Sequence, residues 1–170
     1  MSEFYKTKLD WTDEFVKNNI EIIEKNYSKF PDRNRWNCNV HAIHEDDSDA
    51  LPLDYSFLRK EYDKVVEEFC RERGHELKHI SIIWYNYYKT NQYQEPHRHG
   101  DPDTKGFTAV HYMIFDKDNH FETRFADKTR ISPTIEQGDI LLFPCNWLHY
   151  VPPNHADSPR LTTAFTLVIK

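Results

Sequence analysis

Glycine is scarce in this 170-residue chain, which has only four glycines and three cysteines. So few glycines exclude a linker-rich or low-complexity protein, and the length suits one domain with a sizeable core. The cysteines form no CxxC pair and are odd in number. This pattern favours a reducing, cytoplasmic location over a disulfide framework.

Long apolar runs and basic blocks are also missing. The chain has no stretch of about eighteen consecutive apolar residues, and its first residues, "MSEFYKTKLDW", contain no apolar signal core. Neither a membrane span nor export is therefore expected. The formal net charge is −6, and without clustered lysine or arginine nucleic acid is not an expected partner. The oligomeric state stays open.

Apolar residues recur at helical spacing in two segments of the N-terminal half. The first predicts a helix from Asp13 to about Lys29, with Thr12 or Asp10 as its N-cap. The second predicts a helix from about Ser56 to Arg73, and Gly74 suits its C-terminal stop. Between them, "RWNCNVHAIH" alternates in polarity as a strand does.

From Leu77 onward the segments are short, β-branched and aromatic: "LKHISIIWYNYY", "FTAVHYMIFD", "DILLF" and "RLTTAFTLVI". They are separated by turns rich in Gly, Pro and Asp, and so read as strands. Helices followed by strands predict a single α+β domain spanning residues 1–170. Its helical part is about 1–76 and its β core 77–170, a sandwich or open barrel with the helices packed outside.

The segment "YQEPHRHGDP", residues 93–102, carries the strongest chemical signal. Side chains at i and i+2 of a strand share a face, so either His97 with His99 or His99 with Asp101 fits one metal ion. His149, at the end of a later strand, is the best third ligand. Three such ligands leave half of the coordination sphere open, as in non-heme iron oxygenases.

The sequence after His149, "YVPPNHADSPRLTTAFTLVIK", predicts the loop of an antiparallel hairpin. Folding back there places Arg160, at the start of the next strand, beside His149. Thr162 shares the face of Arg160. A guanidinium beside a metal is suited to clamp a carboxylate in a bidentate manner.

Four pieces in this order, "EPHRHG", "FTAVHYMIF", "GDILLFPCNWLHYVPPN" and "RLTTAFTLVI", resemble the 2-oxoglutarate/Fe(II)-dependent oxygenases. The similarity is greatest to the putative oxygenase subfamily with an HxH signature found in bacteria and tailed phages, and covers roughly Ile80 to Lys170. It implies a double-stranded β-helix (jelly-roll) core that uses Fe(II) and 2-oxoglutarate. The implied reaction hydroxylates an unidentified small-molecule or peptidyl substrate and releases succinate and CO₂.

The resemblance also implies roles for individual residues. His149 matches the distal iron ligand, and Arg160 matches the residue that binds the far carboxylate of 2-oxoglutarate. Thr162 matches a small hydroxyl residue two positions later. Tyr112 matches a strand tyrosine that often holds the same carboxylate, and Tyr87 matches a pocket tyrosine upstream of the first ligand.

The sequence departs from the superfamily at the second ligand, because most members carry H-x-D/E. A carboxylate would neutralise one charge of Fe(II), and Pro102 favours the extended backbone that a ligand at Asp101 needs. The spacing of the subfamily instead favours His97 and His99. We therefore predict His97, His99 and His149 as the metal ligands, with Asp101 as the alternative.

The other histidines have plainer interpretations. His111 neighbours Tyr112 and so faces the opposite side of its strand, where we expect it packed or hydrogen-bonded beneath a helix. Most of the remaining six are expected to face solvent: His41, His44, His75, His79, His120 and His155.

Two other functions stay open. An all-histidine site also resembles cupin-type metal dioxygenases, which bind their substrate without 2-oxoglutarate. A jelly roll that has lost its chemistry would instead serve as a non-catalytic binding module.

Overall fold

The computed structural model describes residues 3–34 and 37–170. The helices are Thr12–Lys29 (α1) and Tyr55–Arg73 (α2). The strands, in chain order from β1 to β10, are Tyr5–Lys8, His41–His44, Leu77–Ile80, Trp84–Tyr88, Gln94–His97, Gly106–Ile114, Arg124–Phe125, Asp139–Pro144, His149–Val151 and Arg160–Ile169.

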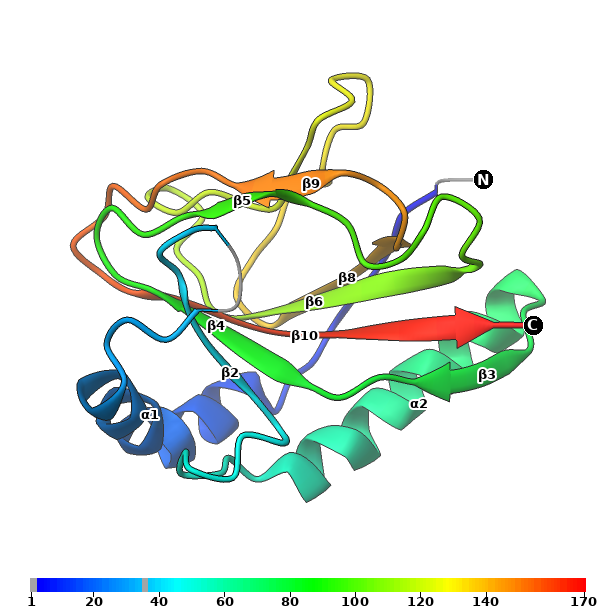
Figure 1. The fold of residues 1–170 in the computed structure, drawn as a ribbon. Helices are drawn as coiled ribbons and strands as arrows, with labels where there is room; N and C mark the ends of the chain where they lie inside the picture. The colour runs from blue at the N-terminus through cyan, green and yellow to red at the C-terminus, as the bar shows by residue number, and fades with distance from the viewer. Residues whose placement is uncertain (1–2, 35–36) are drawn as a thin grey trace.

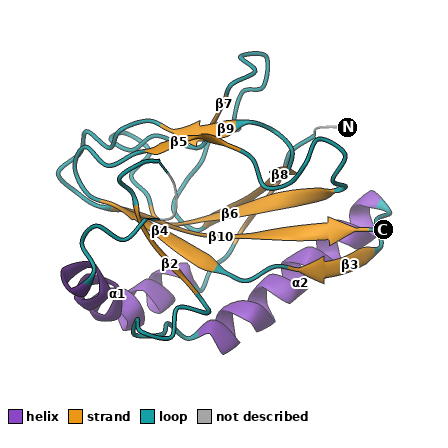
Figure 2. Cartoon of the chain, viewed as in Figure 1, coloured by secondary structure: helices purple, strands orange, loops and turns teal. Residues whose placement is uncertain are grey.

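The strands form two antiparallel sheets that face each other (Figure 1). The larger sheet has the order β1-β8-β6-β10-β4-β2, with β3 also paired to β10, and the smaller one has the order β5-β9-β7. Both helices cover the outer face of the larger sheet (Figure 2). This arrangement confirms the predicted α+β fold with a jelly-roll core and outer helices. Among the described residues, neither helix has the length and apolarity needed to cross a membrane.

Strand alternation gives the larger sheet two different faces. On β10, Leu161 and Phe165 join the core beneath the helices, whereas Ala164 joins the core between the sheets. Arg160 and Thr162 share the inward phase of Ala164 and line a cavity between the sheets. Alternate side chains of β10 therefore pack in the core beneath the helices or face the space between the sheets.

The two predicted helices are present, with one error at a terminus. α2 ends as expected, because Gly74 adopts φ 67° and its amide bonds the Cys70 carbonyl. The N-cap prediction for α1 is wrong: Trp11 occupies that position and makes no side-chain capping bond. The Thr12 hydroxyl instead donates to the Leu9 carbonyl at 2.6 Å, because the turn before the helix folds back locally.

A buried polar network ties both helices to the sheet, as predicted for His111. Its Nε2 lies 2.8 Å from the Thr12 hydroxyl, and its Nδ1 lies 2.8 Å from the Tyr62 hydroxyl. The Tyr62 hydroxyl also bonds Thr163. Burial lowers the pKa of His111 to about 3, so this fully enclosed imidazole is neutral.

Three strand predictions need correction. The segment after His149 is not a hairpin, because β9 pairs with β5 and β7 whereas β10 pairs with β3, β4 and β6. The connection therefore crosses from one sheet to the other. The segment "LKHISIIWYNYY" forms two strands separated by residues 81–83. The strand expected in "RWNCNVHAIH" is confined to His41–His44, and residues 35–36 lie outside the described part.

Candidate metal centre

Three histidines converge at the rim of the smaller sheet. His97 ends β5 and is directly paired with His149, the first residue of β9. His99 lies beyond the end of β5, where its backbone amide donates to the Cys145 carbonyl at 2.8 Å. One nitrogen from each ring lies within 4.8 Å of the others. The histidines from the two distant segments thus form one cluster.

Backbone carbonyls fix the tautomers of two of these rings. His97 Nδ1 lies 2.7 Å from the Glu95 carbonyl, and His149 Nδ1 lies 2.8 Å from the Trp147 carbonyl. Because a carbonyl only accepts, each Nδ1 carries the proton and each Nε2 carries the lone pair. A carbonyl acceptor behind a ligating imidazole also orients the ring and raises its basicity.

Electrostatics keep the cluster uncharged at neutral pH. Burial, followed by the charge of His97, lowers the pKa of His99 to about 3. Burial and the neighbouring His97 and His99 lower the pKa of His149 as well, and burial lowers that of His97. Three neutral imidazoles, two of them with lone pairs fixed by backbone carbonyls, form a donor set suited to iron and other late divalent metals.

The alternative ligand, Asp101, lies away from this cluster. Its side chain is exposed, and its carbonyl accepts a bond from the Thr104 amide at 2.9 Å. The strand stops at His97, and Gly100 adopts φ 136°, so the alternation that would carry Asp101 inward is lost. The group that the structure brings together contains His97, His99 and His149.

A small cavity of about 20 Å³ leads from the histidines into the space between the sheets. Its inner wall contains Arg160, which is 1% exposed. None of the three guanidinium nitrogens has a hydrogen-bond partner within the described chain. The guanidinium lies 4.6 Å from the ring centre of Tyr88 and 5.4 Å from that of Tyr112. A buried cation without an anion is costly, so this site fits an anionic ligand.

The other predicted cosubstrate residues fall on both faces of the sheet. Thr162 is buried and lines the cavity. Tyr112 contributes its ring beneath Arg160, but its hydroxyl already donates to the Thr123 hydroxyl at 2.9 Å and accepts from the Thr123 amide at 3.1 Å. Tyr112 therefore meets the guanidinium through its ring.

The prediction that Tyr87 lines this pocket is wrong. Its hydroxyl donates to Glu24 on α1, and its ring belongs to the core beneath the helices. The neighbouring Tyr88 faces the cavity, where its hydroxyl donates to Gln94 Oε1 at 3.1 Å. Adjacent residues of a strand point to opposite faces of the sheet. The pocket tyrosine is therefore Tyr88, one residue after the predicted Tyr87.

The cavity also contains polar residues that the sequence did not predict as part of the site. Trp84, Asn86 and Tyr88 all line it from β4, and Thr108 lines it from β6. Trp84 Nε1, Asn86 Oδ1 and Thr108 Oγ1 have no hydrogen-bond partner among the described residues. Their spacing of two on β4 was visible in "WYNYY", but only the sheet shows which phase faces inward.

The expectation that most of the other histidines face solvent fails for three of them, since His41, His44 and His120 are buried. His120 has a clear supporting role. Its Nδ1 accepts from the Asp116 amide at 3.0 Å, and its Nε2 then donates to Ser158 at 3.1 Å. It thereby fixes the loop that leads into Arg160.

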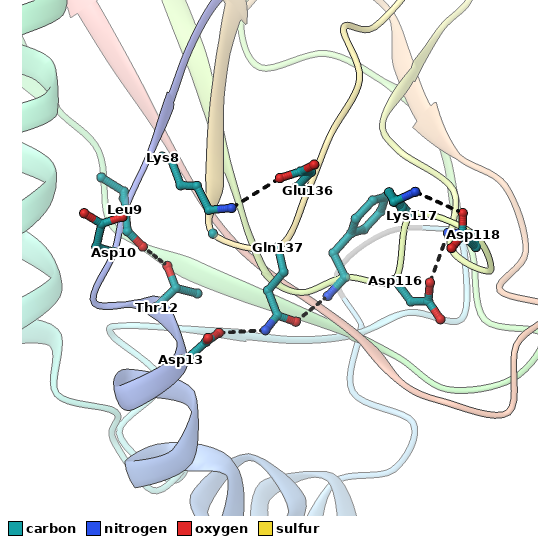
Figure 3. Close-up of a pocket in the computed structure, with 12 residues that line it drawn as sticks. Lys8, Leu9, Asp10, Thr12, Asp13, Asp116, Lys117, Asp118, Glu136 and Gln137 are labelled. Carbon is teal, nitrogen blue, oxygen red and sulfur yellow. Dashed lines mark hydrogen bonds and ion pairs between the residues drawn. The ribbon is translucent and has the colours of Figure 1, made fainter.

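A larger cavity of about 660 Å³ lies elsewhere, where β1 and β6 end and β8 begins (Figure 3). None of the predicted site residues lines it. Lys8 pairs with Glu136 at 3.3 Å, and the Gln137 amide donates to Asp13 at 2.7 Å. Its charged groups largely satisfy one another, so the cavity with the chemistry is the smaller one.

Residues 103–166 match the family model described as "Putative 2OG-Fe(II) oxygenase". This segment of the chain is similar to the 2OG-Fe(II) oxygenases. The matched segment contains Tyr112, His149, Arg160 and Thr162 but begins after His97 and His99, so the HxH feature rests on the residues themselves. No curated protein sequence matches the chain.

Solved structures of 2OG oxygenases share this fold along nearly the whole chain. A viral collagen prolyl hydroxylase from Paramecium Bursaria Chlorella virus-1, in complex with 2OG, is 16% identical with a TM-score of 0.68, covering 98% of this chain and 97% of its own. A Pseudomonas putida prolyl-4-hydroxylase is 15% identical with a TM-score of 0.70, covering 99% and 93%. HygX from Streptomyces hygroscopicus, with nickel and 2-oxoglutarate bound, is 12% identical with a TM-score of 0.64, covering 98% and 82%.

The family match agrees with the predicted resemblance, and the solved structures confirm the jelly-roll fold. The family match over residues 103–166 supports an oxidoreductase that uses Fe(II) and 2-oxoglutarate, whereas the solved structures show the fold alone.

Proposed function

We propose that His97, His99 and His149 hold the Fe(II) of this oxygenase and that Arg160 binds the far carboxylate of 2-oxoglutarate. The buried, unpartnered guanidinium of Arg160 carries the proposal. A charged group enclosed in this way fits a site whose counter-ion is a ligand, and one cavity connects it with the three imidazoles.

The remaining residues of the cavity position the cosubstrate. The guanidinium offers a planar set of donors that a carboxylate accepts in a bidentate manner. Thr162 lies two residues after Arg160 on β10, lines the same cavity, and is paired across the sheet with Asn86. We propose that Thr162 and Asn86 bond the oxygen atoms of the cosubstrate between Arg160 and the histidines.

When bound, Fe(II) and 2-oxoglutarate supply the oxidising chemistry with dioxygen, releasing succinate and CO₂ as a substrate C–H bond is hydroxylated. The protein orients these groups and keeps water out. Its three neutral imidazoles keep their lone pairs available at neutral pH, because burial disfavours their protonation.

The substrate is proposed by class alone, as a small molecule or a peptidyl residue. The viral and bacterial neighbours are named prolyl hydroxylases, and HygX has been solved with hygromycin B. The single-domain organisation and the cytoplasmic location stay predictions.

The all-histidine cluster also fits the cupin-type alternative, a metal dioxygenase that needs no 2-oxoglutarate. Succinate formation separates the two, since only the 2-oxoglutarate-dependent reaction makes it. Failure of the purified protein to bind Mn(II) at micromolar concentrations would instead favour the non-catalytic binding module.

The test uses Mn(II) titration and an anaerobic spectrum. The wild type should bind Mn(II), and Fe(II) with 2-oxoglutarate should give a visible charge-transfer band. His99→Ala and His149→Ala should each weaken Mn(II) binding by about 10-fold or more, because a ligand is lost.

Two matched variants serve as controls. Asp101→Asn and His155→Ala, both at exposed positions, should leave Mn(II) binding within about 2-fold of wild type. A loss of binding in Asp101→Asn with retention in His97→Ala would transfer the ligand role to Asp101. A wild type without the charge-transfer band would overturn the proposed function.

A further inference from the structure

Arg160 lies where β10 loses its regular pairing on one side. On the β6 side, the ladder begins with Leu161 opposite Ile114, and the register shifts between Leu161 and Thr162. On the β4 side, Arg160 pairs with Tyr88 in the last pair of that ladder. Among the described residues, strand pairing therefore holds Arg160 itself on its β4 side alone.

A buried imidazole supplies a connection on the β6 side. His120 follows β6 and is 5% exposed. Its Nδ1 accepts from the Asp116 amide at 3.0 Å, and its Nε2 lies 3.1 Å from both the carbonyl and the hydroxyl oxygen of Ser158. Because a backbone amide only donates, Nδ1 carries the lone pair and Nε2 carries the proton. The ring therefore links the chain after β6 to the chain just before β10.

A second buried side chain reaches the same carbonyl from the β4 side. Asn154 is 3% exposed, and its Nδ2 donates to the Ser158 carbonyl at 3.1 Å and to the Tyr88 carbonyl at 3.3 Å. Its backbone bonds Asn91 and Gln92 in the β4–β5 connection, which lies at the same end of the molecule as the β9–β10 connection (Figure 1). Two buried donors, one tied to the chain after β6 and one tied to β4, thus hold the Ser158 carbonyl.

Pro159 carries this restraint to Arg160. Proline fixes its own φ at about −65°, and it favours extended backbone in the residue before it. Few free torsions therefore separate the held Ser158 carbonyl from the Cα atom of Arg160. The guanidinium makes ring contacts with Tyr88 and Tyr112 but has no hydrogen-bond partner among the described residues. Its direction in the cavity thus depends on how its backbone is held.

We propose that His120 is a positioning residue for Arg160, and that its Nε2–H bond to Ser158 sets the affinity for the far carboxylate of 2-oxoglutarate. The inference rests on the proposed function, in which Arg160 receives that carboxylate. His120 does not line the cavity, so it acts through the backbone alone. Bidentate bonds between a guanidinium and a carboxylate depend on orientation, and an arginine that is free to turn binds more weakly.

Two ligands separate this role from a general loosening of the protein. 2-Oxoglutarate and 2-oxobutyrate share a keto-acid end, but only 2-oxoglutarate carries the far carboxylate. Calorimetric titration of the Mn(II)-loaded protein gives a Kd for each. His120→Phe keeps a ring against Phe115 and removes both hydrogen bonds. It should weaken 2-oxoglutarate binding about 10-fold and change the Kd of 2-oxobutyrate and of Mn(II) by less than about 2-fold.

Further variants test the route of the effect. Glutamine offers an amide N–H in place of the imidazole Nε2–H, so His120→Gln should recover most of the affinity for 2-oxoglutarate. In Arg160→Met, the added change His120→Phe should not alter the Kd of 2-oxoglutarate, because one residue acts through the other. Asn154→Ala removes the other donor to Ser158 and applies the same criteria should His120→Phe fold poorly. His155→Ala is the matched control, since this exposed histidine lies on the same connection, and both Kd values should stay within about 2-fold of wild type.

Three results would overturn the inference: His120→Phe that keeps the wild-type Kd for 2-oxoglutarate, His120→Phe that weakens both ligands equally, or His120→Gln that binds 2-oxoglutarate as weakly as His120→Phe. In each case Arg160→Met would still lose the preference for 2-oxoglutarate over 2-oxobutyrate, so the proposed function would stand. A preference that survives in Arg160→Met would instead remove the proposed role of Arg160 itself.

Discussion

Replacing Arg160 with methionine should affect the free protein and the loaded protein in opposite directions. Methionine keeps an unbranched side chain of similar reach but removes the charge. In the free protein the guanidinium is 1% exposed, and its three nitrogens lack partners among the described residues. Desolvation of an ion costs several kcal/mol, and the contacts with Tyr88 and Tyr112 return about 1–2 kcal/mol each at best.

The free energy of unfolding of metal-free Arg160→Met should therefore not fall, and we expect a rise of about 1–3 kcal/mol. The affinity for 2-oxoglutarate should move the other way. Removing one partner of a buried, hydrogen-bonded charge pair costs about 2–5 kcal/mol, which is roughly 30-fold to several thousand-fold in Kd.

Two measurements on the same samples check this prediction. Urea unfolding of the metal-free proteins gives the change in stability. Thermal unfolding with Mn(II), with and without 2-oxoglutarate, gives the cosubstrate response. At a ligand concentration 100 times Kd, wild type should gain about 2.7 kcal/mol, and the variant should gain little at the same concentration.

Arg124→Met is the matched control, since this arginine is exposed on β7. Its stability and its response to 2-oxoglutarate should both match wild type, within about 0.5 kcal/mol. If Arg160→Met lost several kcal/mol of stability while keeping the response to 2-oxoglutarate, the guanidinium would be a structural group, and the reasoning from its missing partners would fail.

Two further predictions concern pH and the phase of β4. The pKa of His111 is lowered from its ordinary value of 6.5 to about 3 in the folded protein, so the unfolded chain takes up the proton first. The stability contributed by neutral His111 is present above pH 6.5 and is lost as the pH falls toward 3, by about 1.4 kcal/mol per pH unit. Urea unfolding of the metal-free protein from pH 8 to pH 5 should show that His111→Asn is less stable at pH 8 but loses less on acidification; equal acid slopes would contradict the assignment. Tyr88→Phe should weaken 2-oxoglutarate binding, because the bond that holds Gln94 in the cavity is lost, whereas Tyr87→Phe should lower stability by about 1 kcal/mol and leave 2-oxoglutarate binding unchanged, because its partner is Glu24. Thermal unfolding and titration of the charge-transfer band distinguish the two, and the reverse pattern would return the pocket role to Tyr87.

The sequence alone determined the two helices and the chemistry of the ligands. Helical spacing placed α1 and α2 to within a residue at their ends, because an amphipathic helix is a local pattern and glycine stops it locally. The order of the motifs predicted the resemblance to the 2-oxoglutarate/Fe(II)-dependent oxygenases, and the HxH pair with His149 and Arg160 gave the residues of the candidate site.

Tertiary structure decided which side chains meet. The phase of β4 set Tyr88 inward and Tyr87 toward the helices, and neither sheet face is marked in a strand that is buried on both sides. Pairing of β9 with β5 brought His149 beside His97, although a hairpin to β10 is the natural expectation from the turn sequence. The end of β5 at His97 left Asp101 in solvent. Each of these outcomes depends on pairing between segments far apart in the chain, which local patterns do not encode.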